Sequence, residues 1–215
     1  MEGQRVYGGV SGDQRREERR ARLMAAGLVC FGRDGFAATT TRSIAAESGL
    51  TQRYFYESFS GIDDFFAQIV HELGDEWRAK ITDAIAAAPP RLPDRLRAGV
   101  TAYLKVIHRK PYIARILLVE AFTVAPTVKQ VERFLSAMGT VFQEMIAEEF
   151  PAKSKVVSDR DALATGYVGA VHHIALRWFR SQFSEPLEKI ADVITKLIEG
   201  SISGYGAQRT SPPAR

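Results

Sequence analysis

Residues 39–59 read TTTRSIAAESGLTQRYFYESF, and this is the most informative stretch of the chain. The hydroxyls of Thr39–Thr41 are candidate caps for one short helix, because a cap side chain accepts a hydrogen bond from an unpaired backbone N–H. Gly49 stands where a left-handed residue would end that helix. Phe55 and Phe59, four residues apart, then anchor a second helix to a core. Two short helices joined by a tight turn are typical of a helix-turn-helix.

The second helix of this motif leaves several polar side chains pointing outward. Thr51 is its candidate cap, and the outward side chains are Gln52, Arg53, Tyr54, Tyr56 and Ser58. All of them can form hydrogen bonds with the phosphates or bases of duplex DNA. A plain helical hairpin with capped ends fits the same pattern, so the flanking sequence has to separate the two interpretations.

The sequence on both sides repeats the spacing of amphipathic helices. An apolar stripe runs from residue 21 to residue 31 behind an Arg- and Glu-rich start, and a longer one runs from Ile62 to Ile81 and stops at Pro89. Five more stripes follow between residues 92 and 198. No strand-like alternation competes with them, so we predict an all-α protein of about nine helices.

Composition narrows the class of protein further. Hydrophobic residues make up 46% and charged residues 25% of the 215, as in an ordinary globular protein. The net charge of +4 permits an anionic partner such as nucleic acid without demanding one. Cys30 is the single cysteine, which excludes an internal disulfide and favours a cytoplasmic location. We expect no secretory signal and no membrane span, because no stretch of roughly 18 apolar residues occurs.

The sequence offers no candidate for catalysis or metal binding. The GxSxG, GxGxxG, Walker A and HExxH patterns are all absent. His172 and His173 are adjacent, so on a helix they face different directions, and no Cys, Asp or Glu stands beside them at ligand spacing. We therefore predict that the protein is not an enzyme and holds no metal or cofactor.

The region around the quoted stretch resembles the N-terminal domain of the tetracycline-repressor-like (TetR) family of transcriptional regulators. The resemblance covers about residues 15–75, while the remainder matches in helix count and length. It rests on Phe31, Gly35-Phe36, Ala38-Thr39-Thr40, Arg42, Ile44-Ala45, Ser48-Gly49-Leu50, Phe55-Tyr56, Phe59 and Phe65-Phe66. It implies a three-helix DNA-binding head, a larger ligand-binding and dimerisation body, and repression as the family's usual behaviour. The expected parts are a flexible arm (residues 1–13), the helix-turn-helix domain (14–60), the body (61–204) and a flexible tail (205–215).

The resemblance also implies which residues touch operator DNA. The positions that align with family contacts are Thr41, Thr51, Gln52, Arg53, Tyr56 and Ser58, to which we add Arg42 and Tyr54. The tyrosine that aligns with Tyr56 donates to a backbone phosphate. Two residues depart from the family pattern: Arg53 replaces a small residue, often Gly, and Ile62 replaces a lysine that contacts phosphate. Arg42 and the arginines between residues 15 and 22 can compensate for that lysine.

The body contains many large residues that combine an apolar face with a polar tip. Aromatic walls with sparse polar groups suit a small-molecule cavity, although the same rings could simply fill a core. We expect such a cavity between the fourth and eighth helices, and a hydrophobic effector that is neutral or weakly polar. The candidate contacts are Trp77, Tyr103, Ile107, His108, Tyr112, Phe122, Met138, Phe142, Tyr167, His172 and Trp178.

The last two long helices, over residues 159–183 and 186–203, carry too many apolar residues for one buried face. We expect them to form a four-helix interface between two copies of the chain. The resulting hypothesis is a homodimeric regulator that a hydrophobic small molecule releases from a palindromic operator. The alternatives are a DNA-binding regulator without a small-molecule effector, and a helical interaction module or enzyme without a DNA role.

Overall fold

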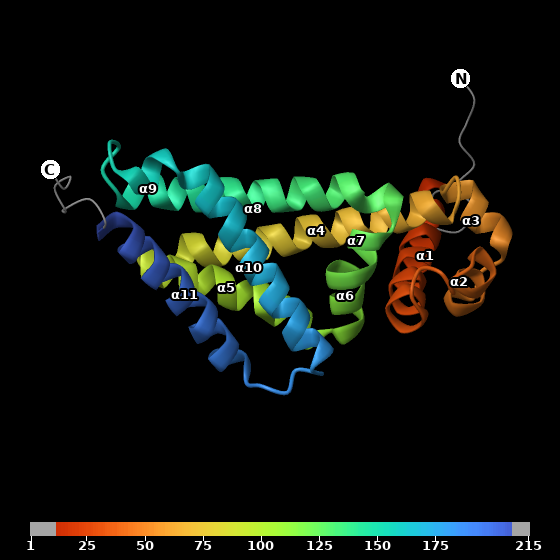
Figure 1. Cartoon of the computed structure of the whole chain (residues 1–215). Helices are drawn as coiled ribbons and strands as arrows, with labels where there is room; N and C mark the ends of the chain where they lie inside the picture. Colours follow the sequence, from red (N-terminus) through yellow and green to blue (C-terminus); the bar gives the residue numbers. More distant parts are fainter. Residues whose placement is uncertain (1–11, 208–215) are drawn as a thin grey trace, which may run out of the picture.

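The computed structural model describes residues 12–207, and these fold into helices joined by short loops (Figure 1). No strand occurs among the described residues, which confirms the all-α class. Gly12 already begins the first helix, and the rest of the predicted arm lies outside the described residues, as does most of the predicted tail. The long helices are α1 (Gly12–Asp34), α4 (Ile62–Ala87), α5 (Leu92–Arg109), α8 (Val128–Glu149), α10 (Arg160–Arg180) and α11 (Leu187–Ala207). The short ones are α2 (Thr41–Ser48), α3 (Gln52–Ser58), α6 (Pro111–Arg115), α7 (Ala121–Thr123) and α9 (Lys155–Ser158).

The connection between α5 and α8 is more broken than the sequence predicted. A single helix was expected there, but α6 passes into a π-helical turn, η1 (Ile116–Glu120), before α7, and a 3₁₀ turn, η2 (Ala125–Thr127), follows. α9 was not predicted, because a single turn is too short to show a period. Among the described residues, no single helix is long and apolar enough to cross a membrane; the pair Pro111–Thr123 and Ala125–Glu149, bent by 100°, passes that test by length and composition only.

The head, which we define as α1–α3 with the first turns of α4, is built around phenylalanine rings. Phe31 and Phe65 are fully buried. The ring centroids of Phe31 and Phe66 lie 4.6 Å apart, and those of Phe59 and Phe65 lie 4.5 Å apart. Gly27 allows α4 to approach α1, because a Cβ at this position would lie 2.4 Å from the Phe65 ring. The two short helices of the motif therefore rest on a rigid aromatic base.

α4 continues from the head into the body, where α5 and α8 lie alongside it (Figure 1). Trp77 of α4 packs between Tyr103 of α5 and Phe134 of α8, with ring centroids 4.3 Å and 5.0 Å away. The Trp77 Nε1–H donates to the Tyr103 carbonyl oxygen at 3.2 Å, so the buried indole is satisfied. α10 packs on α8, and α11 packs on α5, which completes the bundle.

Candidate DNA interface and ligand cavity

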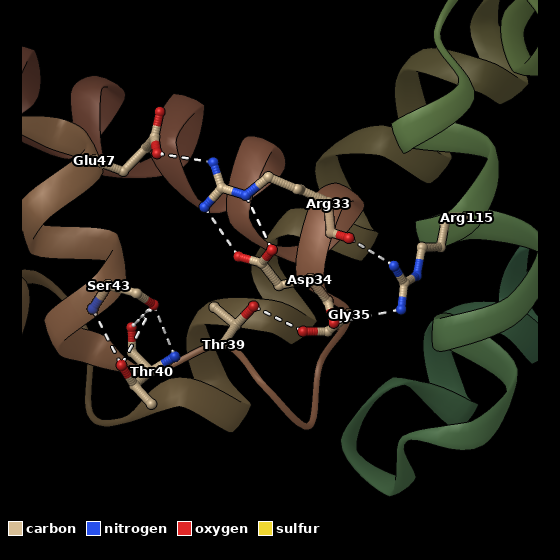
Figure 2. A network of polar contacts seen from close by, with 8 residues as sticks. All are labelled: Arg33, Asp34, Gly35, Thr39, Thr40, Ser43, Glu47 and Arg115. Carbon is tan, nitrogen blue, oxygen red and sulfur yellow. Dashed lines mark hydrogen bonds and ion pairs between the residues drawn. The ribbon is translucent and has the colours of Figure 1, made fainter.

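Both ends of α2 lie where the threonines and the glycine predicted them. Thr40 is the N-cap: its Oγ1 accepts from the Ser43 N–H at 3.1 Å, and the Ser43 Oγ accepts from the Thr40 N–H at 3.0 Å (Figure 2). Thr39 donates instead to the Gly35 carbonyl oxygen at 2.7 Å, which closes the loop before α2. Gly49 ends the helix with φ 65°. These contacts fix the angle at which α2 leaves α1.

The start of α3 differs from the prediction. Thr51 holds the N-cap position, but its hydroxyl accepts no hydrogen bond from the helix, so the expected side-chain cap is wrong. The turn is closed by the backbone, because the Tyr54 N–H donates to the Thr51 carbonyl oxygen at 3.1 Å. Phe55 is fully buried and orients the remaining residues of α3. The Thr51 hydroxyl is therefore left available to a phosphate.

Three of the predicted DNA contacts meet where the first residue of α2 lies against α3. Gln52 Nε2 donates to Thr41 Oγ1 at 3.1 Å, and that oxygen lies 3.3 Å from the Tyr56 hydroxyl. The Tyr56 side chain is among the most exposed large apolar groups of the head, at 60%. Its ring packs edge-on against Phe55, which holds the hydroxyl at a fixed height above α3.

The other predicted contacts divide by exposure. Arg42 and Arg53 are exposed, and Ser58 is half-buried. Tyr54 is half-buried and does not point freely outward as predicted, because its ring faces α1, where the Arg19 guanidinium lies 4.5 Å from the ring centroid. Tyr54 therefore helps to attach α3 to α1.

Three of the six arginines that were expected to replace the family's lysine have partners inside the head. Arg20 donates to Gln68 on α4 at 2.9 Å, and Arg22 donates to a carbonyl oxygen at the end of α2. Together with Arg19 they hold α1 to the other three helices of the head. Ile62 itself packs against the core. Arg42 and the exposed residues Arg15 and Arg16 remain as candidate phosphate contacts.

Sequence reasoning missed Glu57, which lies on the face of α3 that points away from the core. Arg53 Nε donates to Glu57 Oε1 at 2.9 Å, so a carboxylate lies beside the cation that was expected to enter the groove. The spacing of four residues between Arg53 and Glu57 was visible in the sequence and is the usual spacing of helical ion pairs.

Arg115 joins the head to the body (Figure 2). Its Nη1 donates to the Arg33 carbonyl oxygen at 2.7 Å, at the end of α1, and its Nε pairs with Glu120 on η1 at 3.1 Å. Arg33 in turn pairs with Glu47 on α2 at 3.2 Å. A continuous series of contacts therefore runs from η1 through the end of α1 to the helix-turn-helix.

The body contains an apolar cavity of about 90 Å³ between α4, α5, α8, α10 and α11. Five of the predicted ligand contacts line it: Tyr103, Met138, Phe142, Tyr167 and His172. A smaller cavity of about 30 Å³ lies next to it, and Trp77, Phe122 and His172 are among its lining residues. The two cavities share Phe134, Leu135 and His172 as walls, so movement of these side chains would join them.

The polar groups in this wall are uncharged or paired. The Tyr103 hydroxyl lies 3.3 Å from His172 Nδ1, and burial raises the pKa of the tyrosine. Burial also lowers the pKa of His172 from 6.5 to about 4, with a smaller contribution from His173, so the imidazole is neutral at pH 7. Arg95 lines the larger cavity as well and pairs with Glu148. The cavity therefore favours an apolar ligand with few polar atoms.

Four predicted ligand contacts line neither of these two cavities. Ile107 is fully buried in the core between helices. His108 and Trp178 stack on each other with centroids 5.2 Å apart, and the Trp178 Nε1–H donates to the Glu185 carbonyl oxygen at 2.8 Å. Tyr112 lies against α1, where a Cβ on Gly32 would come within 2.3 Å of the Tyr112 Cβ. The period of the apolar residues predicted the buried faces of these helices, but it does not determine where each residue lies along the cavity.

Family comparisons agree with both halves of the structure. Residues 23–69 match the model described as "Bacterial regulatory proteins, tetR family". Residues 93–201 match "Tetracyclin repressor-like, C-terminal domain". The chain belongs to the TetR family. It is therefore a transcriptional regulator with a helix-turn-helix head for DNA and a C-terminal body of the TetR ligand-binding type.

Solved TetR-type structures share this fold at low sequence identity. The fatty acid degradation regulator FadR from Bacillus halodurans is 14% identical with a TM-score of 0.72, over 84% of this chain and 98% of that one. FadR from Bacillus subtilis in complex with stearoyl-CoA is 11% identical with a TM-score of 0.72, over 83% and 97%. A TetR-family regulatory protein from Rhodococcus RHA1 is 24% identical with a TM-score of 0.68, over 86% and 97%. No curated protein matches by sequence.

Proposed function

We propose that this TetR protein is a homodimeric repressor that leaves a near-palindromic operator when a hydrophobic small molecule enters its body. The observation that carries the ligand part is the apolar cavity between α4, α5, α8, α10 and α11, with its neutral Tyr103–His172 pair. The structural likeness to FadR from Bacillus subtilis, which was solved with stearoyl-CoA, supports an acyl chain as one class of effector.

The size of the cavity links ligand entry to a change of shape. A cavity of about 90 Å³ is smaller than the roughly 300–1,000 Å³ of ordinary ligand pockets. An effector must therefore push the walls apart, and the flexible Met138 and Met145 on α8 can adapt to it. A ligand that binds only the enlarged body draws the population toward that state.

The segment α6–η1–α7 offers a route from the cavity to the head. Leu117 on η1 and Phe122 on α7 line the smaller cavity, and Arg115 just before them holds the end of α1. Displacement of this wall would shift Arg115 relative to the Arg33 carbonyl oxygen. The two heads of the dimer would then no longer match the spacing of two operator half-sites.

The proposed dimer uses α10 and α11. Val193 and Leu197, one turn apart on α11, remain 49% and 50% exposed. A Cβ on Gly200, in the next turn, would meet open space. An exposed apolar stripe on a long terminal helix supports an isologous contact with a second copy.

A two-step experiment tests the proposed function. A thermal-shift screen of acyl compounds, neutral aromatics and charged metabolites comes first, followed by release of bound operator DNA by each compound that stabilises the protein. We expect hydrophobic compounds to do both. Stabilisation by highly charged metabolites alone, with DNA release, would reject the apolar effector, and DNA binding without any stabilising compound would favour a regulator that lacks a small-molecule effector.

A further inference from the structure

Arg53 and Glu57 occupy the centre of the surface that α3 turns away from the core. Phe55 is fully buried, and each of the two charged residues lies two positions from it, about 200° around the helix. The Arg53 side chain is 85% exposed, whereas that of Glu57 is 38% exposed. In a helix-turn-helix the second helix lies in the major groove, with its N-terminal residues against base edges. Arg53, the second residue of α3, therefore lies where base contacts are made.

The contact between the two side chains leaves part of the guanidinium available. Arg53 Nε donates to Glu57 Oε1 at 2.9 Å, and no hydrogen bond joins Nη1 or Nη2 to another described residue. The guanidinium is planar, so fixing Nε also fixes the direction of the two Nη groups. These two groups form the fork that donates to O6 and N7 of guanine.

A role in stability does not account for the carboxylate. An exposed ion pair four residues apart on a helix contributes little to folding. A negative charge at the centre of a DNA-facing surface repels the phosphate backbone, which lowers affinity for every sequence. Without the carboxylate, the Arg53 guanidinium would bind any phosphate within reach. Such a contact carries no sequence information.

We propose that Glu57 is a positioning residue for operator recognition: it holds the Arg53 guanidinium toward one guanine of each half-site and away from phosphates. The proposal goes beyond effector control, because it concerns only how the head reads sequence. It also explains how an arginine can stand where the family usually has a small residue. Because Glu57 already restricts the Arg53 side chain, little rotational freedom is lost when Arg53 binds DNA.

The test is selection of duplexes from a random library, followed by binding titrations on every single-base variant of the selected half-site. The proteins are full-length wild type, Arg53→Ala, Glu57→Ala and the double variant. Alanine maintains the helix at both positions. Arg53→Ala should lose preference at one guanine by about tenfold or more. Glu57→Ala should lose most of the same preference and bind random DNA more tightly. The slope of its binding constant against salt concentration should increase by the equivalent of about one phosphate contact per half-site. The double variant should match Arg53→Ala in its base preferences.

Glu47→Ala is the matched control, because Glu47 is also an exposed carboxylate of the head that pairs with an arginine, but on α2. It should leave every base preference unchanged. The proposal is overturned if Glu57→Ala changes no base preference, or changes one at a different position from Arg53→Ala, which would make Glu57 a direct base contact. If the wild-type protein selects no sequence, the proposed sequence-specific repression fails together with the role of Glu57. If the wild-type protein selects a sequence but Glu57→Ala changes no base preference, only the role of Glu57 fails.

Discussion

At the scale of single residues, we propose that the Tyr56 hydroxyl contacts a phosphate and not a base. It lies beside Thr41 at the start of α2, and Tyr56 is 60% exposed. Tyr56→Phe should weaken binding to all DNA sequences alike, by about 1.5–3 kcal/mol per half-site, because a hydrogen bond to a charged group is lost. Titrations on specific and random duplexes measure this. Tyr54→Phe is the control, and an equal loss in both variants would contradict the assignment.

His172 makes the stability of the body depend on pH. Burial lowers its pKa from 6.5 to about 4, so the unfolded chain binds a proton between these values that the folded chain does not. Stability therefore falls as pH drops from 6.5 toward 4. The free energy of unfolding of His172→Phe should fall by about 1–2 kcal/mol less than that of the wild type over this pH range. This value allows for the partial exposure of the ring. Urea unfolding at several pH values measures it, with the neighbour variant His173→Gln as control. An unchanged pH profile in His172→Phe would show that the ring is not held neutral by burial.

At the scale of elements, we propose that the exposed stripe of α11 forms the interface of the dimer. Replacing both Val193 and Leu197 by Glu should give a monomer at micromolar concentration, because two like charges would face their copies across the interface. Operator affinity should fall about 10²-fold or more, since two linked half-site contacts reinforce each other. Light scattering and DNA titration check both results. Val128→Glu, at a residue 42% exposed on α8, should remain dimeric. A dimer that survives the double change would place the interface elsewhere.

The segment α6–η1–α7 is the element that should couple effector to operator. Arg115→Ala removes its contacts with the end of α1 and with Glu120. The effector should still raise the melting temperature, but it should release DNA less effectively, with the coupling reduced by about 1 kcal/mol or more. Parallel thermal-shift and DNA-release titrations measure the two effects. Arg97→Ala, which removes an ion pair with Asp192 within the body, is the control. Equal coupling in wild type and Arg115→Ala would reject this route.

The helices also show how much of the fold and of the candidate site could be predicted from the sequence. The period of the apolar residues predicted the long helices, and Thr40 and Gly49 bounded α2 as expected, because these signals are local. The positions of Trp178 and Tyr112 depended on the angles at which α10 and α6 cross the body, which no local pattern contains. The π-helical turn and the Arg115 contact are likewise tertiary. Glu57 was predictable from its spacing to Arg53, but its importance follows only from the exposed face that Phe55 defines.

At the scale of the whole molecule, one α4 helix connects the DNA-binding head to the body (Figure 1). A single α3 helix of seven residues reads too few bases to specify a site, so we expect selectivity to require two copies of the chain. Affinity should come from phosphate contacts and selectivity from a few side chains of α3. In the proposed dimer, a small molecule that enlarges the body would alter the spacing of the two heads without touching DNA.

The most direct test of this account is selection of duplexes from a random library by the full-length protein, followed by titration of the selected site against salt. We predict a near-palindrome whose half-sites are separated by about one helical turn or a small multiple of it. The logarithm of the binding constant should fall linearly with the logarithm of the salt concentration, as counterions are released. Equal affinity for every sequence after selection, or binding that does not respond to salt, would contradict the central claim.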